Sequence, residues 1–470
     1  MRGYVKLADG FHKVIDFYSL KSDGYHRWLN WGVEEKTDDE VIIYVYELPT
    51  IEGSVRFEVY YRTSDPTDTN GNIIYTARII GTGTPDPNVS FGSTDMADKV
   101  SEAGITVSLV KHLKVWDGVK PYAYSRLFMD FANAEDVAIA DSCTSFGKYS
   151  FYGDTALVTA RLGAGTTDIR DCAFKNCSAL ANINFPDTLQ SIDYSAFSGC
   201  SSLETVDMSG CAIDTLGQYC FAYCTALKNV SFPSDGLLQI PDYGFIGCTA
   251  LQNIVIPNTI THILQYAFCN CTSLPSIAIP DSVEYIRQYA FLGCSAMTTV
   301  TFGSGVKDIQ QYAFARTGIV TLKTPAALEK LGRCVFRECN QLTHADLSDS
   351  VIQNIQTQLF YGCTALTECL LPNTVKMLGT EAFSGCSALS SITIPANVTL
   401  IYSSAFRDCS ALALVDMTAC SSDITIYSDA FTTIAQNSVI TVSSAELKAY
   451  IENPDNGIIN ADGRTTVELV

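Results

Sequence analysis

The feature that most constrains the fold is a phenylalanine that recurs about every 23 residues through more than half of the chain. Successive members are 22 to 25 residues apart, and most are 23 apart. The recurring residues are Phe151, Phe174, Phe197, Phe221, Phe245, Phe268, Phe291, Phe314, Phe336, Phe360, Phe383, Phe406 and Phe431. A period this short, sustained this long, is typical of a solenoid, in which each repeat forms one coil and stacks on its neighbours.

Each repeat can be interpreted as a short strand followed by a turn. An apolar-x-apolar pair often closed by proline, as in Ile392 to Pro395, puts two apolar side chains on one face of a strand. Proline then ends the strand, because it has no N–H for the ladder. A second apolar pair, such as Val398 and Ile401, precedes the motif AFxxC. We expect the Ala, Phe and Cys of this motif to point inward. The sequence therefore predicts an α/β-type solenoid of short parallel strands.

Cysteine is the second recurring residue. All 18 cysteines lie between Cys143 and Cys420. Ten of them stand three positions after a repeat phenylalanine: Cys177, Cys200, Cys224, Cys248, Cys271, Cys294, Cys339, Cys363, Cys386 and Cys409. Buried cysteine packs as a small apolar side chain, so the pattern favours an internal column of free thiols.

Two other interpretations of the cysteines are weaker. Zinc is suggested by close pairs such as Cys269 and Cys271, but no pair of CxxC knuckles and no nearby histidine completes a tetrahedral set. Disulfides between coils are disfavoured, because parallel side-chain vectors suit the bond poorly. We predict no metal site and no cofactor.

The repeats divide the chain into three parts. Residues 126–433 form the predicted solenoid of about 13 coils of about 23 residues, and residues 434–470 form a C-terminal cap. Residues 1–125 contain no cysteine and carry β-rich segments at Val41–Leu48, Val55–Tyr61 and Ile73–Ile80, with another near residues 107–118. They predict a small, mostly antiparallel β domain that caps the first coil or anchors the array to something larger.

One loop and three tryptophans stand out in this N-terminal part. Residues 64–72, with Asn70 before Gly71, predict a hairpin loop. A calcium loop is the alternative, although its acids and glycine miss the EF-hand register. Trp28, Trp31 and Trp116 are the three tryptophans of the chain.

Charge and composition exclude several classes of function. The formal net charge is −20, with 50 acidic and 30 basic residues, which disfavours nucleic acid and anionic membrane surfaces as partners. No apolar run is long enough for a membrane span, and the first 20 residues do not have the pattern of a secretory signal. The five histidines fall in no triad or metal motif, and no phosphate-binding glycine motif is present. We expect no enzymatic activity.

The repeat consensus AFxGCxxLxxIxIPxxVxxIxxxAF resembles the BspA-like leucine-rich repeats of bacterial surface proteins. Residues Ala382 to Pro395 fit it closely, and the resemblance covers about residues 128–431. It implies a leucine-rich repeat horseshoe or curved rod with a non-enzymatic role in adhesion or protein binding. The segment ITVSSAELKAYIENPDNG is similar to the extended segment and short helix that often close such arrays. The resemblance implies no particular ligand.

A column of tyrosines is the most distinctive candidate for a ligand-binding surface. Two residues before the phenylalanine, five successive repeats carry Tyr219, Tyr243, Tyr266, Tyr289 and Tyr312. Four of them follow a glutamine: Gln218, Gln265, Gln288 and Gln311. One interpretation is a stripe that contacts a ligand, because aromatic rings offer large contact area at small entropic cost. The other is a self-stacking ladder that stiffens the solenoid.

Two classes of function remain open from the sequence. The first is a cell-surface or secreted adhesion protein whose solenoid binds a protein or glycan, such as a host molecule, without membrane insertion. The second is a structural or receptor-binding component of a larger assembly, such as a virion appendage or a cytoplasmic assembly, docked through the N-terminal β domain. The family resemblance favours the first class, and the missing signal sequence favours the second.

Overall fold

The structure is a computed structural model that describes residues 2–6, 12–16, 40–48, 50–62, 67, 73–85, 100–101, 103–115, 125–126, 128–129, 131–459 and 464–470. It contains two compact units, Met1–Thr225 and Ala226–Val470. The predicted hairpin loop with its calcium alternative, apart from Thr67, and all three tryptophans lie outside the described residues.

The first unit is built on a seven-stranded sheet in the order β11-β9-β7-β6-β5-β4-β3. Its strands are β3 (Glu40–Leu48), β4 (Thr50–Arg62), β5 (Tyr75–Pro85), β6 (Val110–Val115), β7 (Asp136–Ile139), β9 (Thr159–Arg161) and β11 (Asn182–Ile183). As predicted, β3, β4 and β5 pair antiparallel. In contrast, β6 pairs in parallel with both β5 and β7. The antiparallel sheet therefore continues without interruption into the first coils.

The N-terminal sheet is held by packing on one face and by an ion pair on the other. Phe57 is fully buried and contacts Phe128 and Phe131, with ring centroids 6.1 and 6.3 Å away. Because side chains alternate along a strand, Glu58 points to the opposite face. There Arg78 Nε donates to Glu58 Oε2 at 2.8 Å, and both side chains are buried. Both faces of this part of the sheet are therefore covered.

The first unit also contains a second set of strands that the sequence did not predict. A four-stranded parallel sheet is formed by β8 (Ser145–Phe146), β10 (Asp168–Ile169), β12 (Ser191–Ile192) and β14 (Thr215–Leu216). The remaining elements are the hairpin of β1 (Arg2–Lys6) and β2 (His12–Asp16), the 3-10 turn η1 (Val107–Leu109) and β13 (Thr205–Asp207). Each coil thus contributes two short strands, one to each of two parallel ladders.

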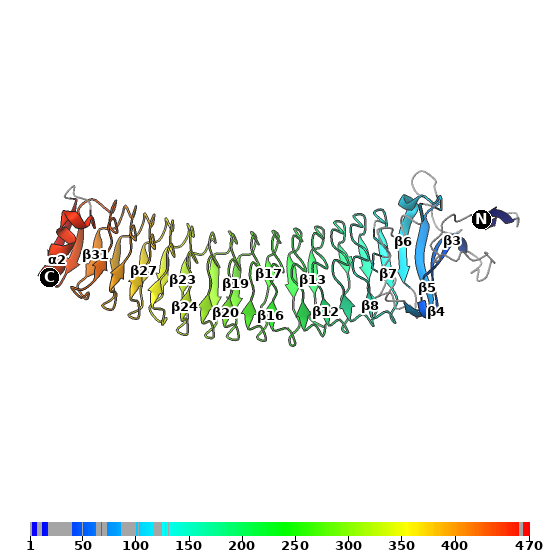
Figure 1. The fold of residues 1–470 in the computed structure, drawn as a ribbon, viewed down its shortest axis with the longest axis horizontal. Coiled ribbons are helices and arrows are strands. Elements are labelled where there is room, and N and C mark those ends of the chain that lie inside the picture. The colour runs from blue at the N-terminus through cyan, green and yellow to red at the C-terminus, as the bar shows by residue number, and fades with distance from the viewer. Residues whose placement is uncertain are drawn as a thin grey trace. The chain divides into compact units, whose positions relative to one another are not determined.

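The second unit repeats this plan (Figure 1). The first strands of its coils are β15 (Asn229–Ser231), β17 (Asn253–Ile254), β19 (Ser276–Ile279), β21 (Thr299–Phe302), β23 (Thr321–Lys323), β25 (His344–Asp346), β27 (Glu368–Leu370), β29 (Ser391–Thr393), β31 (Leu414–Met417) and β33 (Ser438–Val442). The second strands are β16 (Gln239–Ile240), β18 (His262–Ile263), β20 (Tyr285–Ile286), β22 (Asp308–Ile309), β24 (Lys330–Leu331), β26 (Asn354–Ile355), β28 (Met377–Leu378), β30 (Leu400–Ile401) and β32 (Thr425–Ile426). Neighbouring strands in these ladders pair in parallel.

Burial within a coil follows the predicted pattern. In β19 the side chains alternate between exposed and buried, with Ile277 and Ile279 inside. The second apolar pair, Val283 and Ile286, is fully buried. The turn that follows carries the inward-pointing Ala, Phe and Cys, and the solenoid of parallel strands predicted from the sequence is confirmed.

The repeat phenylalanines stack on one another through the core of each unit. Phe291 lies between Phe268 and Phe314, with ring centroids 5.3 and 5.0 Å away and planes tilted by 14° and 10°. One coil alone has no partner for either face of its ring. The core is therefore formed between coils rather than within them.

All 18 cysteines are buried free thiols. In nine of the ten coils with the repeat cysteine, its thiol reaches back to the phenylalanine carbonyl of the preceding coil, as where Cys294 Sγ donates to Phe268 O at 3.2 Å. That carbonyl also accepts the N–H of Cys271 in its own coil, at 3.1 Å. The thiol thus satisfies the second lone pair of a buried carbonyl, a role that packing alone did not predict.

The C-terminal segment closes the second unit. As predicted, an extended segment, β33, is followed by a short helix, α2 (Ala445–Glu452), whose Leu447 and Ile451 are buried. The 3-10 turn η3 (Pro454–Asn456) and β34 (Thr465–Leu469) complete the chain, and β34 pairs in parallel with β33. Within the described residues, no helix is both long and apolar enough to cross a membrane.

Candidate ligand-binding surface

The predicted tyrosines share an unusual backbone conformation. Tyr243, Tyr266, Tyr289 and Tyr312 have φ between 56° and 60°, in the left-handed region that glycine adopts most easily. The residues with this conformation two positions before the phenylalanine are Tyr149, Cys172, Ser195, Tyr219, Tyr243, Tyr266, Tyr289, Tyr312, Cys334, Gln358, Glu381, Ser404 and Asp429. None is glycine, although a side chain there costs roughly 1–2 kcal/mol. The position therefore carries a side chain in all thirteen coils, at a conformational cost that glycine would not have.

In the second unit four of the tyrosines form a continuous stack. The ring centroids of Tyr243 and Tyr266, Tyr266 and Tyr289, and Tyr289 and Tyr312 are 4.8, 4.5 and 5.1 Å apart. The planes are within 12° of parallel in all three pairs. Each ring is half-buried because its neighbours cover its faces. Ring edges and phenol tips are therefore what the stack presents to a ligand.

The fifth tyrosine lies in the first unit. There Tyr219 meets Tyr194 edge to face, with centroids 5.9 Å apart and planes at 70°. The glutamine before it, Gln218, is exposed. Within the second unit, the structure brings all four of the predicted tyrosines together.

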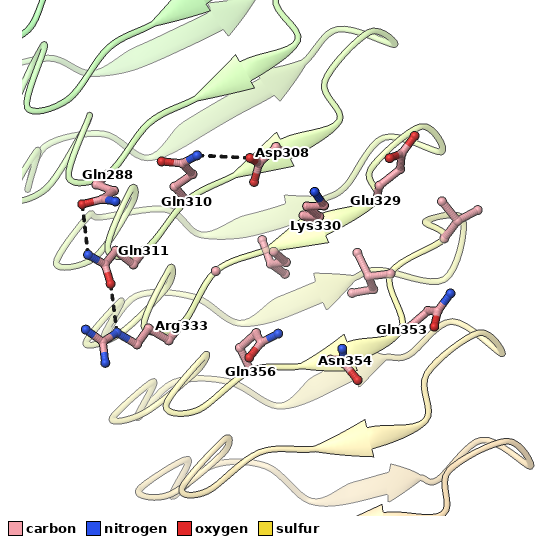
Figure 2. Close-up of a pocket in the computed structure, with 14 residues that line it drawn as sticks. Gln288, Asp308, Gln310, Gln311, Glu329, Lys330, Arg333, Gln353, Asn354 and Gln356 are labelled. Atoms are coloured by element: carbon pink, nitrogen blue, oxygen red, sulfur yellow. Dashed lines mark hydrogen bonds between the residues drawn. The ribbon is translucent and has the colours of Figure 1, made fainter.

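Two of the predicted glutamines, Gln288 and Gln311, form a hydrogen-bonded row that continues to an arginine (Figure 2). Gln311 Nε2 donates to Gln288 Oε1 at 3.0 Å, and Arg333 Nε donates to Gln311 Oε1 at 2.9 Å. Gln265 is placed differently, since its backbone N–H donates to Asp242 Oδ1 at 2.9 Å. Hydrogen bonds between side chains of successive coils fix the orientation of these amides.

A hollow of about 930 Å³ opens next to this row, over strands β22, β24 and β26 of the second unit. Its lining residues are Gln288, Asp308, Gln310, Gln311, Glu329, Lys330, Leu331, Gly332, Arg333, Val351, Ile352, Gln353, Asn354 and Gln356. Gln288 and Gln311 belong both to the predicted row and to the hollow. The two features therefore form one surface, which we call the stripe and its hollow.

Gly332 belongs to the lining of the hollow, at a point where two coils lie close together. A Cβ on Gly332 would lie 2.5 Å from the backbone nitrogen of Gln311, so glycine allows two coils to approach closely. The coil between Phe314 and Phe336 is also the shortest, at 22 residues. Apart from Gln288 and Gln311, sequence analysis did not identify the residues that line the hollow.

The charges in the hollow balance. Two carboxylates, Asp308 and Glu329, are offset by Lys330 and Arg333, and Gln310 Nε2 donates to Asp308 Oδ2 at 3.1 Å. At the end of the stack, a hydrogen bond with Cys334, together with partial burial, raises the pKa of Tyr312. The phenol therefore stays neutral and keeps its proton for hydrogen bonding at physiological pH.

The cysteines are poorly suited to catalysis. Burial raises the pKa of Cys224 and Cys409 to about 12, whereas a nucleophilic thiol needs a lowered pKa. Across the part of the chain that the structure describes, no group of three or more His, Cys, Asp or Glu side chains is placed to hold a metal ion. The arrangement is suited to binding.

Comparison with known proteins agrees with this fold. A family model described as a BspA type leucine rich repeat region matches in six copies, over residues 122–237, 214–343 and 329–451. A leucine-rich repeat protein from Bacteroides ovatus is similar in structure, with a TM-score of 0.55 and 22% identity over 77% of this chain and 88% of that one. At this identity the likeness shows the fold alone.

Two further solved structures align with lower scores. A leucine rich cell surface protein from Faecalibacterium prausnitzii has 21% identity and a TM-score of 0.39, over 88% of this chain and 97% of that one. The pneumococcal vaccine antigen PcpA has 17% identity and a TM-score of 0.44, over 90% and 99%. A search of curated proteins finds no significant match. Because the family model spans well over half of the chain, the protein belongs to the BspA-type leucine-rich repeat family.

Proposed function

We propose that this protein is a non-enzymatic binding protein that presents the stripe and its hollow to a protein or glycan partner. The observation that carries the proposal is the continuity of the surface: four stacked tyrosines, a hydrogen-bonded amide row and a hollow that shares two of those amides. Rigid aromatic and amide groups lose little entropy on binding.

The family supports a binding role. Leucine-rich repeat solenoids are generally binding scaffolds or surface proteins, and thiols with raised pKa argue against cysteine catalysis. We propose further that the protein acts as an adhesion module at the cell surface or in secreted form. Among the described residues, no structural feature specifically favours the alternative role in a virion or other large assembly.

A paired substitution tests the proposal. In Tyr266→Ser with Tyr289→Ser, we expect binding to an array of immobilised glycans and extracellular-matrix proteins to be lost, since phenol tips and ring edges disappear from the middle of the stripe. The matched control is Tyr402→Ser with Tyr427→Ser, another stacked pair in the second unit, with centroids 5.2 Å apart. Equal binding by the two variants would rule out the stripe as the site.

A further inference from the structure

The hydrogen-bonding groups of the hollow are held in fixed positions before any ligand arrives. Gln311 both donates to Gln288 and accepts from Arg333, and Gln310 donates to Asp308. Figure 2 shows these side chains around the hollow, whose strands β22 and β24 pair in parallel. Each amide carries two donor hydrogens and an acceptor oxygen, so several sites remain for a ligand beyond the bonds already made.

The balance of charge argues against an ionic ligand. The two acids and two bases of the hollow offset each other, and Asp308 already accepts a hydrogen bond. An anionic ligand would also meet the field of a chain with a net charge of −20. A cationic ligand would meet the positive charges of Lys330 and Arg333 in the same lining.

The hollow also lacks the features of a site for a protein side chain. Hot spots of protein interfaces are usually aromatic or arginine anchors buried in apolar pockets. Here the tyrosine faces are covered by one another, and Val351, which is 47% exposed, is the one large apolar side chain with substantial exposure in the lining. What the surface offers is a dense set of neutral donors and acceptors.

We infer that the hollow binds the hydroxyl groups of a neutral oligosaccharide, with the phenol tips of the stack continuing the same site. This inference rests on the proposed function and specifies its ligand class. Two adjacent hydroxyls of a sugar ring can form two hydrogen bonds with one side-chain amide: one hydroxyl accepts from the amide NH2, and the other donates to the amide oxygen. Coils repeat at about 4.8 Å, a step similar to the length of one sugar ring, so a chain laid along the stack meets a phenol at each coil.

The test is calorimetric titration of the full chain with tetrasaccharides. The neutral probes are β-linked glucose and N-acetylglucosamine tetramers, and the comparison probes are a sulfated tetrasaccharide and a set of extended peptides. Asn354→Tyr, on β26, places a ring in the hollow and should raise Kd for the neutral probe by about tenfold or more. Thr425→Tyr is the matched control, because Thr425 occupies the same strand position in β32 of the same sheet and does not line the hollow.

Salt dependence provides a second readout. Binding of a neutral ligand should change little between about 0.01 and 0.15 M salt, whereas an ionic ligand is screened over that range. Neutral binding that is lost in Asn354→Tyr and kept in Thr425→Tyr supports the inference. Preference for the sulfated or peptide probes, or equal neutral binding by both variants, overturns it. Failure of every neutral probe also overturns it, and the proposed function still stands if the tyrosine pair is needed for array binding.

Discussion

At the scale of single residues, the repeat cysteine acts as a small buried hydrogen-bond donor. Three of the thirteen coils lack it and carry Asp154, Thr317 or Ile434 in its place. The Thr317 hydroxyl donates to Phe314 O of its own coil at 2.9 Å and lies 3.3 Å from the thiol of Cys339 in the next coil. Because isoleucine has no side-chain donor, the thiol is common at this position but is not required in every coil.

The buried thiols predict a loss of stability at alkaline pH. Burial raises the pKa of Cys224 and Cys409 to about 12, whereas an unfolded cysteine ionises near pH 8.5. Because the pKa is raised in the folded state, the stabilising contribution of each thiol to the free energy of unfolding is fully present below about pH 8.5. That contribution is lost as the pH rises toward 12. In that window each thiol lowers the free energy of unfolding by about 1.4 kcal/mol per pH unit.

Urea unfolding between pH 7 and pH 10.5 measures this effect. Tyrosine and lysine also titrate in the upper part of the range, so the comparison is made with Cys224→Ala and Cys409→Ala together. We expect this variant to be less stable at pH 7 and to lose stability less steeply as the pH rises. Identical slopes for the variant and the natural protein would show that the thiols are not the cause.

At the scale of the coil, the sequence predicted the inward face and missed the second strand. The AFxxC motif is buried as predicted, since no part of Ala290, Phe291 or Cys294 is exposed. The second strand, such as Tyr285–Ile286, has two residues, too few for alternation to be recognised in a sequence. The left-handed tyrosine position was equally hidden, since nothing in the residue type indicates a positive φ for tyrosine.

Removing one ring from the phenylalanine stack should damage the solenoid locally. Phe291→Ala leaves a cavity between two neighbouring rings and should cost about 3–5 kcal/mol. Because each coil contacts its neighbours, hydrogen exchange should rise first in the coils around residue 291 and leave β3, β4 and β5 protected. Uniform loss of protection along the whole chain would contradict this.

At the scale of the whole molecule, the N-terminal sheet and the first coils share one hydrogen-bonded sheet. The sequence indicated the strands and their antiparallel pairing, but the parallel addition of β6 depends on long-range packing that local pattern does not encode. The hollow was unpredictable for a similar reason, because its lining residues come from several successive coils. The division at residues 125/126 and 433/434, with caps at both ends, remains our proposal.

If the N-terminal part is a cap, its removal should cause association. A chain of residues 126–470 lacks β6 and exposes the edge of β7, and unpaired edges pair with other chains. We expect oligomers by size-exclusion chromatography with light scattering. Adding Ala138→Lys to this truncated chain should restore the monomer, because a charge protects an edge strand. A monomeric truncated chain without that substitution would argue for an anchor.

If the tyrosine column is kept for contact with a ligand, replacing two of its members with glycine should remove binding and leave the coils folded. In Tyr266→Gly with Tyr289→Gly, relief of the left-handed strain offsets the lost stacking of about 0.5–1.5 kcal/mol per pair. The measurement is the melting temperature together with binding to the glycan and matrix array. We expect the double glycine variant to melt within a few degrees of the natural protein and to lose binding. A large fall in melting temperature with binding intact would contradict it and identify the column as a structural ladder.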